Sequence, residues 1–303
     1  MGMRKFYLYI GLFLLPILVF LGGAEYIVRS IPNEYRYKNE WMNQHADEVE
    51  TLIFGSSHAW FGINPAYFDG VTFNLSFMSQ SPKYDCFLLE KWGDNYKKLK
   101  TIIVPISYFT FFFDEPFGVP QVAAYYRIYM DCPYHSWLSA AGLELTQAKA
   151  LHGKLITLRE NQWKVLCNEY GWHAEPFVPK DDDWDDAVKV RNLVGIQTGS
   201  VDAVEQNYSY LKEMATFCSQ HHVRMILVSI PMSDAYNKAL DRQQLAVTYQ
   251  QIQRAKEELK LEYYDYRKDT RFSDDDFADL NHLNTVGSEK FTRMMIQDMQ
   301  LNN

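Results

Sequence analysis

The chain has 303 residues, of which 47% are hydrophobic and 16% aromatic, and it carries a net charge of −8 at pH 7. This length supports one large domain or two small ones with an ample core, and the composition lacks the polar bias of a disordered chain. The acidic balance, with an isoelectric point near 5.5, excludes an extended basic face and therefore predicts no nucleic-acid partner.

The amino terminus predicts a membrane anchor. Residues 6–24 contain no charged side chain and are rich in Leu, Phe and Ile, and Arg4 and Lys5 precede them. Such a stretch is long enough to cross a bilayer as a helix, and the leading positive charges favour an amino terminus on the inside. A signal peptide cleaved near the small residues 22–24 is the alternative. In both cases residues 1–28 direct the remaining chain to the extracytoplasmic (periplasmic) side of the cytoplasmic membrane, and an anchor would make the protein single-pass.

Short runs rich in Ile, Val, Leu, Phe and Tyr predict five strands. They are Thr51–Phe54, Val71–Leu75, Thr101–Ile106, Arg224–Ile230 and Glu262–Asp265. Segments with helical spacing of apolar residues separate them, as in the face formed by Val204, Tyr208 and Leu211. Strands that alternate with helices indicate a parallel sheet covered on both sides. We therefore expect an α/β fold, a flavodoxin-like three-layer sandwich with a roughly five-stranded parallel sheet, in addition to the N-terminal transmembrane helix.

Two segments depart from this alternation. Residues 29–50 are polar and carry both signs of charge, which predicts a stalk that becomes a helix before the first strand. Residues 109–198 are aromatic at first and then helical, and we expect an insertion that packs over the sheet end and shapes a pocket. The acidic run 181–186 lacks the spacing of a calcium loop, and the four cysteines form no C-x-x-C pair. We therefore expect no metal and no cofactor, and either disulfides or reduced core thiols.

The first motif is the turn Gly55-Ser56-Ser57-His58, which directly follows the first predicted strand. Ser57 would lie at the carboxyl end of that strand, where open α/β sheets form their binding and catalytic sites. A serine after a strand is also a common helix N-cap, which is the structural alternative for Ser57.

The second motif is Asp279-x-x-His282, between the fifth strand and the C-terminal helix. At this spacing the aspartate accepts a hydrogen bond from its own histidine, which fixes the imidazole tautomer and stabilises the cation formed when the histidine takes a proton from a serine. A chance pair is a serious alternative in a chain with eight histidines. The position favours function, because this loop and Ser57 are expected at the same sheet edge.

Together the two motifs resemble the first and last blocks of the SGNH/GDSL hydrolase superfamily. The turn G-S-S-H with a following G-x-N-P is similar to that of membrane-anchored, cell-envelope members related to polysaccharide O-acetylation proteins. The resemblance covers residues 51–295 in outline and implies an SGNH-like catalytic domain over residues 51–303. It implies Ser57 as nucleophile, His282 as general base and Asp279 as the partner that orients His282. The backbone N–H of Ser57 would be one oxyanion donor.

The resemblance also implies two further oxyanion donors. In the turn N-L-S-F-M-S-Q-S after the second strand, Ser79 stands where the family has glycine, and its backbone N–H would serve. Relatives often carry an asparagine just after the third strand, but the segment I-S-Y-F-T has none. Ser107 is then the available donor, and loss of a preorganised donor costs on the order of a hundredfold in rate. His58 and Asn64 are candidates for lining the pocket and contacting substrate.

These features predict a serine-dependent acyl-ester hydrolase or O-acyl (acetyl) transferase that acts on a cell-envelope glycan outside the cytoplasmic membrane. A transferase would need an acyl donor, and the resemblance implies a multi-spanning membrane acyltransferase as partner. The alternative is a non-catalytic glycan-binding or assembly subunit on the same fold, which the absent asparagine and the aromatic segment favour.

Overall fold

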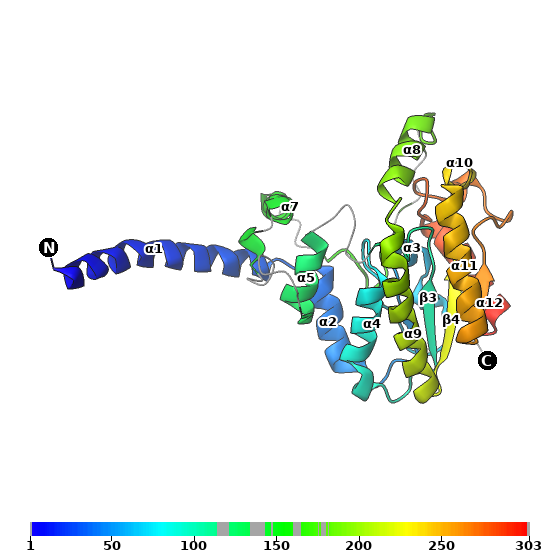
Figure 1. The fold of residues 1–303 in the computed structure, drawn as a ribbon, viewed down its shortest axis with the longest axis horizontal. Coiled ribbons are helices and arrows are strands. Elements are labelled where there is room, and N and C mark those ends of the chain that lie inside the picture. Colours follow the sequence, from blue (N-terminus) through cyan, green and yellow to red (C-terminus); the bar gives the residue numbers. More distant parts are fainter. Residues whose placement is uncertain are drawn as a thin grey trace. The chain divides into compact units, whose positions relative to one another are not determined.

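A computed structural model describes residues 2–113, 121–133, 143–146, 148–159, 165–174, 176, 180 and 182–301 (Figure 1). Parts of the predicted insertion, and Asp181 of the acidic run, lie outside these residues. The α-helices and strands, in chain order, are α1 (Met3–Ser30), α2 (Glu34–His45), β1 (Thr51–Ile53), α3 (Ser57–Gly62), β2 (Thr72–Asn74), α4 (Pro82–Lys91), β3 (Thr101–Pro105), α5 (Gln121–Met130), α7 (Ala148–Arg159), α8 (Ala187–Ile196), α9 (Val204–Gln220), β4 (Arg224–Ser229), α10 (Asp234–Ala239), α11 (Arg242–Glu258), β5 (Glu262–Asp265) and α12 (Thr285–Met299). Short 3₁₀ turns include η1 (Pro65–Tyr67) and η3 (Glu144–Thr146).

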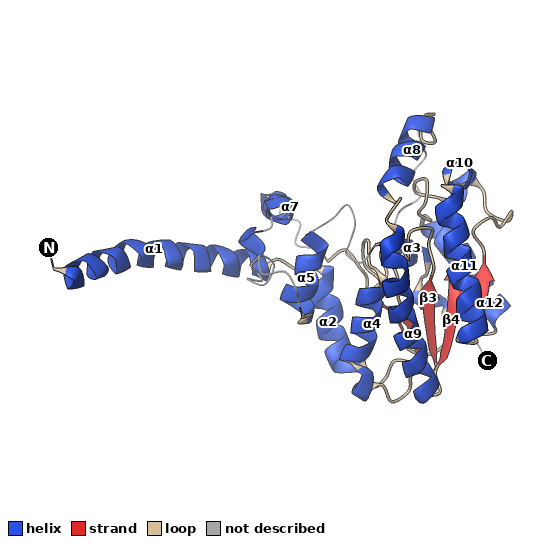
Figure 2. Ribbon diagram, viewed as in Figure 1, coloured by secondary structure: helices blue, strands red, loops and turns tan. Residues whose placement is uncertain are grey.

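The five strands form one sheet in the order β2-β1-β3-β4-β5, with every neighbouring pair parallel. Leu52 in the centre of β1 pairs with Phe73 of β2 and Ile102 of β3. Figure 2 shows helices on both sides of the strands. The predicted α/β fold with a five-stranded parallel sheet is therefore confirmed. This strand order places the topological switch point between β1 and β3, at whose carboxyl ends such sheets form their sites.

The core explains why the strands read as apolar runs. Ile53, Ile103 and Ile226 come from three neighbouring strands and are fully buried in one hydrophobic cluster. Phe291 and Met295 of α12 pack into the same cluster. A strand covered on both faces has no solvent-facing positions to fill with polar residues, so the alternation of a half-exposed strand is absent.

Met1–Asn39 and Ala123–Val165 form one compact unit, and Glu40–Val122 and Leu166–Asn303 form a second that contains the sheet. In the first unit, the Glu25 carboxylate accepts the backbone N–H groups of Glu144 at 2.9 Å and Leu145 at 3.0 Å. Lys154 Nζ donates to Glu144 Oε1 at 2.6 Å. The charged groups at the end of α1 are thus paired within this unit. The predicted boundaries of anchor, stalk and insertion stay predictions.

Helix α1 is long and apolar enough to cross a membrane, by length and composition. Its 28 residues correspond to about 42 Å of helix, which exceeds the hydrocarbon thickness of about 30 Å. Its apolar side chains up to Leu21 are exposed in the chain alone, whereas Val28 near its end is buried. A signal sequence has the same properties, so both alternatives for the amino terminus are consistent with this helix.

A loop near Gly171 closes the β2 edge of the sheet. Gly171 has φ +76°, and a Cβ atom there would lie 2.3 Å from the carbonyl oxygen of Asn74. The Trp60 indole N–H of α3 donates to the Gly171 carbonyl at 3.1 Å, and the Trp172 indole N–H donates back to a carbonyl of α3 at 2.9 Å. This close approach of two backbones requires a residue without a side chain.

We expect Gly171→Ala to lower the free energy of unfolding by at least about 2 kcal/mol, because it adds left-handed strain and a clash with backbone. Gly195→Ala is the matched control, since a Cβ there meets no atom within 4 Å and alanine favours the helix by up to about 1 kcal/mol. Urea unfolding of the detergent-solubilised chain, followed by tryptophan fluorescence, measures both. Equal stability of the two variants would contradict this account of the loop.

Candidate active site

The turn after β1 delivers Ser57 to the sheet edge. Gly55 has φ +105°, and a Cβ there would approach Pro105 Cδ of the neighbouring strand to 3.2 Å. The glycine therefore lets the chain turn tightly beside β3. Ser57 is the first residue of α3 and is buried. Its hydroxyl is bonded to another side chain and does not cap the helix.

Ser57, His282 and Asp279 form a continuous hydrogen-bonded chain. Ser57 Oγ lies 2.8 Å from His282 Nε2, and His282 Nδ1 lies 2.7 Å from Asp279 Oδ2. A carboxylate accepts only, so His282 carries its proton on Nδ1 and presents the lone pair of Nε2 to the serine hydroxyl. The structure thus brings together the three residues that the sequence motifs predicted, in the order that a nucleophile, a base and an orienting group require.

The loop that carries His282 is held in place by hydrogen bonds to Asp279. Asp279 Oδ1 accepts the backbone N–H groups of Asn281 at 2.9 Å and His282 at 2.8 Å. Burial of this carboxyl raises its pKa, but the charge and hydrogen bonds of His282 and the backbone N–H groups outweigh that effect, and the net pKa lies below its ordinary value. Asp279 is therefore ionised at neutral pH, as a partner for a histidine cation must be.

Two backbone donors lie on turns beside the nucleophile. The N–H groups of Ser57 and Ser79 have no hydrogen-bond acceptor within the described part of the chain. The turn that contains Ser79 is hydrogen-bonded to the turn that contains Ser57, because the Phe77 N–H donates to the Gly55 carbonyl at 3.3 Å. Ser79 has φ +53°, a left-handed conformation that favours glycine. Its side chain is partly exposed at this edge.

His58 and Asn64 both form hydrogen bonds within the protein. His58 is only 2% exposed and bridges two other side chains, with Nδ1 2.7 Å from Ser107 Oγ and Nε2 2.9 Å from Asn281 Nδ2. Burial and the neighbouring His282 lower the pKa of His58 well below its ordinary value, so its ring is neutral. The side chain of Asn64 caps η1 by accepting the Ala66 N–H at 3.0 Å. Both side chains therefore have partners within the fold, and their contact with substrate stays a prediction.

Asp85, on α4, is a residue that the sequence motifs did not indicate. Its Oδ1 accepts the Gly55 N–H at 3.0 Å and also the side-chain amide of Gln80. One carboxyl oxygen thereby connects the turn that contains Ser57 to the turn that contains Ser79. Burial raises the pKa of Asp85 to about 7, against the lowering effect of these two hydrogen bonds. Asn281 was missed as well, because nothing in its local sequence indicates a contact with His58.

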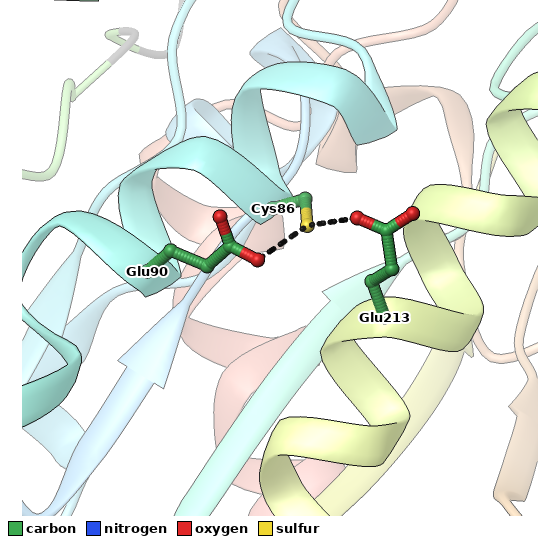
Figure 3. A group of neighbouring side chains, drawn as sticks. All are labelled: Cys86, Glu90 and Glu213. Atoms are coloured by element: carbon green, nitrogen blue, oxygen red, sulfur yellow. Dashed lines mark hydrogen bonds between the residues drawn. The ribbon is translucent and has the colours of Figure 1, made fainter.

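A cluster of Cys86, Glu90 and Glu213 has the residue types of a metal site (Figure 3). Cys86 Sγ lies 3.9 Å from Glu90 Oε1 and 3.6 Å from Glu213 Oε2. Burial and the two carboxylates raise the pKa of this thiol, so it stays protonated and donates to them. The group therefore fits hydrogen bonding between α4 and α9. The four cysteines all lie among the described residues, and none of them forms a disulfide.

Comparison with known proteins finds a distant likeness among solved structures. No family model matches the chain, and no curated protein matches it. Among solved structures, it is similar to a GDSL-like lipase from Bacteroides thetaiotaomicron, at 12% sequence identity and a TM-score of 0.41, over 88% of this chain and 97% of that one. Assignment of a function therefore depends on the geometry of the site.

The raised pKa of Asp85 predicts a pH dependence of stability. Between the ordinary value of 3.8 and about 7, the folded state binds a proton that the unfolded state releases, so the free energy of unfolding falls as pH rises through this window. Asp85→Asn keeps the acceptor oxygen and cannot ionise. We expect it to match wild type near pH 4 and to be more stable by about 2 to 4 kcal/mol at pH 8.

Urea unfolding at several pH values measures this difference, and Asp279→Asn is the control with the opposite sign. The pKa of Asp279 is lowered, so its stabilising effect is present above its ordinary pKa and is lost as pH falls. Asp279→Asn should thus be less stable than wild type at neutral pH and approach it in acid. A difference between Asp85→Asn and wild type that does not change with pH would disprove the assignment.

Proposed function

We propose that this chain is a serine-dependent acyl-ester enzyme of the SGNH/GDSL type. The observation that carries the proposal is the chain of hydrogen bonds from Ser57 Oγ through His282 to Asp279, at 2.8 and 2.7 Å. Three features support the superfamily: the strand order, the serine that follows β1, and the aspartate and histidine that precede the last helix. These positions correspond to the first and last blocks that the sequence resembles.

The geometry supports the following reaction steps. His282 Nε2 takes the proton of the Ser57 hydroxyl while Oγ forms a bond to the ester carbonyl carbon. The carbonyl oxygen becomes an anion, and its donors are the N–H groups of Ser57 and Ser79, which have no acceptor among the described residues. Collapse of this intermediate breaks the ester bond, and His282 returns the proton to the leaving alkoxide. Water or a sugar hydroxyl then attacks the acyl-enzyme by the same route in reverse.

We further propose that the substrate is an acylated glycan of the cell envelope and that the group transferred is acetyl or similar. Support comes from two features. The side chain of Asp279 is 56% exposed, so this end of the hydrogen-bonded chain lies at the surface, where a polymer has access. Helix α1 is apolar enough to span a membrane, with Arg4 and Lys5 at its start, which favours an anchored enzyme on the extracytoplasmic (periplasmic) side of the cytoplasmic membrane.

We expect a fluorophosphonate probe to label the wild-type chain at Ser57, because the probe reacts with activated serines. Ser57→Ala should remove labelling, and His282→Ala and Asp279→Asn should slow it by about 10³-fold or more, since the base and its tautomer are lost. Ser56→Ala is the matched control and should label like wild type, because its side chain makes no cap hydrogen bond. A wild-type chain that neither labels nor hydrolyses aryl acetates would overturn the proposal and favour a glycan-binding subunit.

A second experiment separates hydrolase from transferase. The chain is given an aryl acetate with and without a polysaccharide acceptor, and release of the aryl alcohol is compared with formation of free acetate and acetylated polymer. We expect a transferase to place the acyl group on the polymer and to need a membrane acyltransferase as its natural donor. Acetate released at an unchanged rate, with no acetylated polymer, would identify a hydrolase.

A further inference from the structure

A second hydrogen-bonded chain lies beside the triad and runs from Asn281 through His58 to Ser107. Asn281 Nδ2 is 2.9 Å from His58 Nε2, and His58 Nδ1 is 2.7 Å from Ser107 Oγ. All three residues are buried, with 2%, 2% and 6% of their surfaces exposed. His58 follows the nucleophile directly, and its ring lies 5.3 Å from that of His282. A polar chain this close to the reacting groups needs a reason beyond packing.

The direction of the hydrogen bonds follows from the donor at one end. With its amide in this orientation, Asn281 Nδ2 only donates, so His58 Nε2 is the acceptor. A neutral imidazole then carries its proton on Nδ1 and donates it to Ser107 Oγ. The lowered pKa of His58 agrees with a neutral ring. Ser107 Oγ is therefore an acceptor toward His58, and its own O–H is free to donate elsewhere.

Ser107 belongs to the same sheet edge as Ser57. Ser107 follows β3, the strand next to β1 in the sheet, and so lies at the switch point where Ser57 stands. Its backbone is pinned, since the Ser107 N–H donates to Thr110 Oγ1 at 2.8 Å and its carbonyl accepts the Thr110 N–H at 3.1 Å. Among the residues that the structure describes, none accepts the hydroxyl hydrogen of Ser107. Accepting a hydrogen bond also makes a hydroxyl a stronger donor.

We propose that Asn281 and His58 orient the Ser107 hydroxyl as a donor to the oxyanion that forms at the scissile carbonyl. The inference rests on the proposed function and adds to it a third oxyanion donor, with Ser107 as the catalytic residue and His58 and Asn281 as positioning residues. We call Asn281, His58 and Ser107 the relay. Its Ser107 stands where members of the family that the sequence resembles often carry an asparagine. The relay differs from a simple clamp on the catalytic loop, which would need the contact of His58 with Asn281 but not with Ser107.

The test compares kcat and KM for an aryl acetate across variants of this chain. Ser107→Ala and His58→Ala should each lower kcat about 10²-fold with KM changed less than threefold, because an oxyanion donor acts only in the transition state. The double variant should lose no more than either single one, since both changes remove one interaction. His58→Asn should recover at least a tenth of wild-type kcat, because its amide N–H lies near the place of Nδ1. Ser56→Ala is again the control.

Stoichiometric fluorophosphonate labelling of each variant shows that the triad remains folded. If His58→Ala is slow while Ser107→Ala turns over like wild type, the residues form only a clamp and the relay is wrong. Losses that multiply in the double variant would also overturn it. Failure of the proposed function can be distinguished from failure of the relay alone. If the proposed function is wrong, the wild type itself is inactive, and the relay is then wrong as well.

Discussion

The hydrogen bond between Ser57 Oγ and His282 Nε2 joins residues 225 positions apart, and the proposed activity depends on it. It forms because β1 and β5 belong to one parallel sheet, whose strands all end at the same edge. The loops that follow these strands must therefore meet. A parallel sheet thus converts two short local motifs into one site, and its buried core holds the serine and histidine at fixed separation.

Burial at this edge imposes a second constraint, because each polar group removed from water needs a partner. Asp85 meets the N–H of Gly55 and the amide of Gln80, and Asn74 donates to the carbonyls of Ala59 and Ile63 at 3.0 and 3.1 Å. These bonds leave the N–H groups of Ser57 and Ser79 as donors without acceptors in the described chain. The neighbouring polar groups have hydrogen-bond partners, whereas within that part of the chain these two N–H groups do not. Donors held in place in this way stabilise an anion at little reorganisation cost.

The strands could be predicted from sequence because their signals are local, and so could the contact of Asp279 with His282. The contact of His282 with Ser57 could be expected only through the predicted parallel sheet. Apolar runs mark the strands, Gly55 marks the turn, and Asp279 and His282 lie three residues apart, so their contact needs no knowledge of the fold. Asp85 and the partners of His58 could not be predicted, because those contacts join α4 to a turn 30 residues earlier and His58 to residues 49 and 223 positions away. A histidine beside the nucleophile suggested substrate contact, whereas burial gives it protein partners on both nitrogens.

The proposed relay explains how the short side chain of Ser107 can serve as a donor where the family resemblance implies an asparagine. An asparagine presents planar N–H groups whose direction is fixed once its side chain is packed. A serine hydroxyl rotates about its C–O bond, so as a donor it is preorganised only when a second group holds its lone pair. His58 supplies that group through Nδ1, and Asn281 holds the imidazole in the required tautomer. Asn281 also lies between Asp279 and His282. In the proposed mechanism one loop therefore positions both the base His282 and, through His58, the oxyanion donor Ser107.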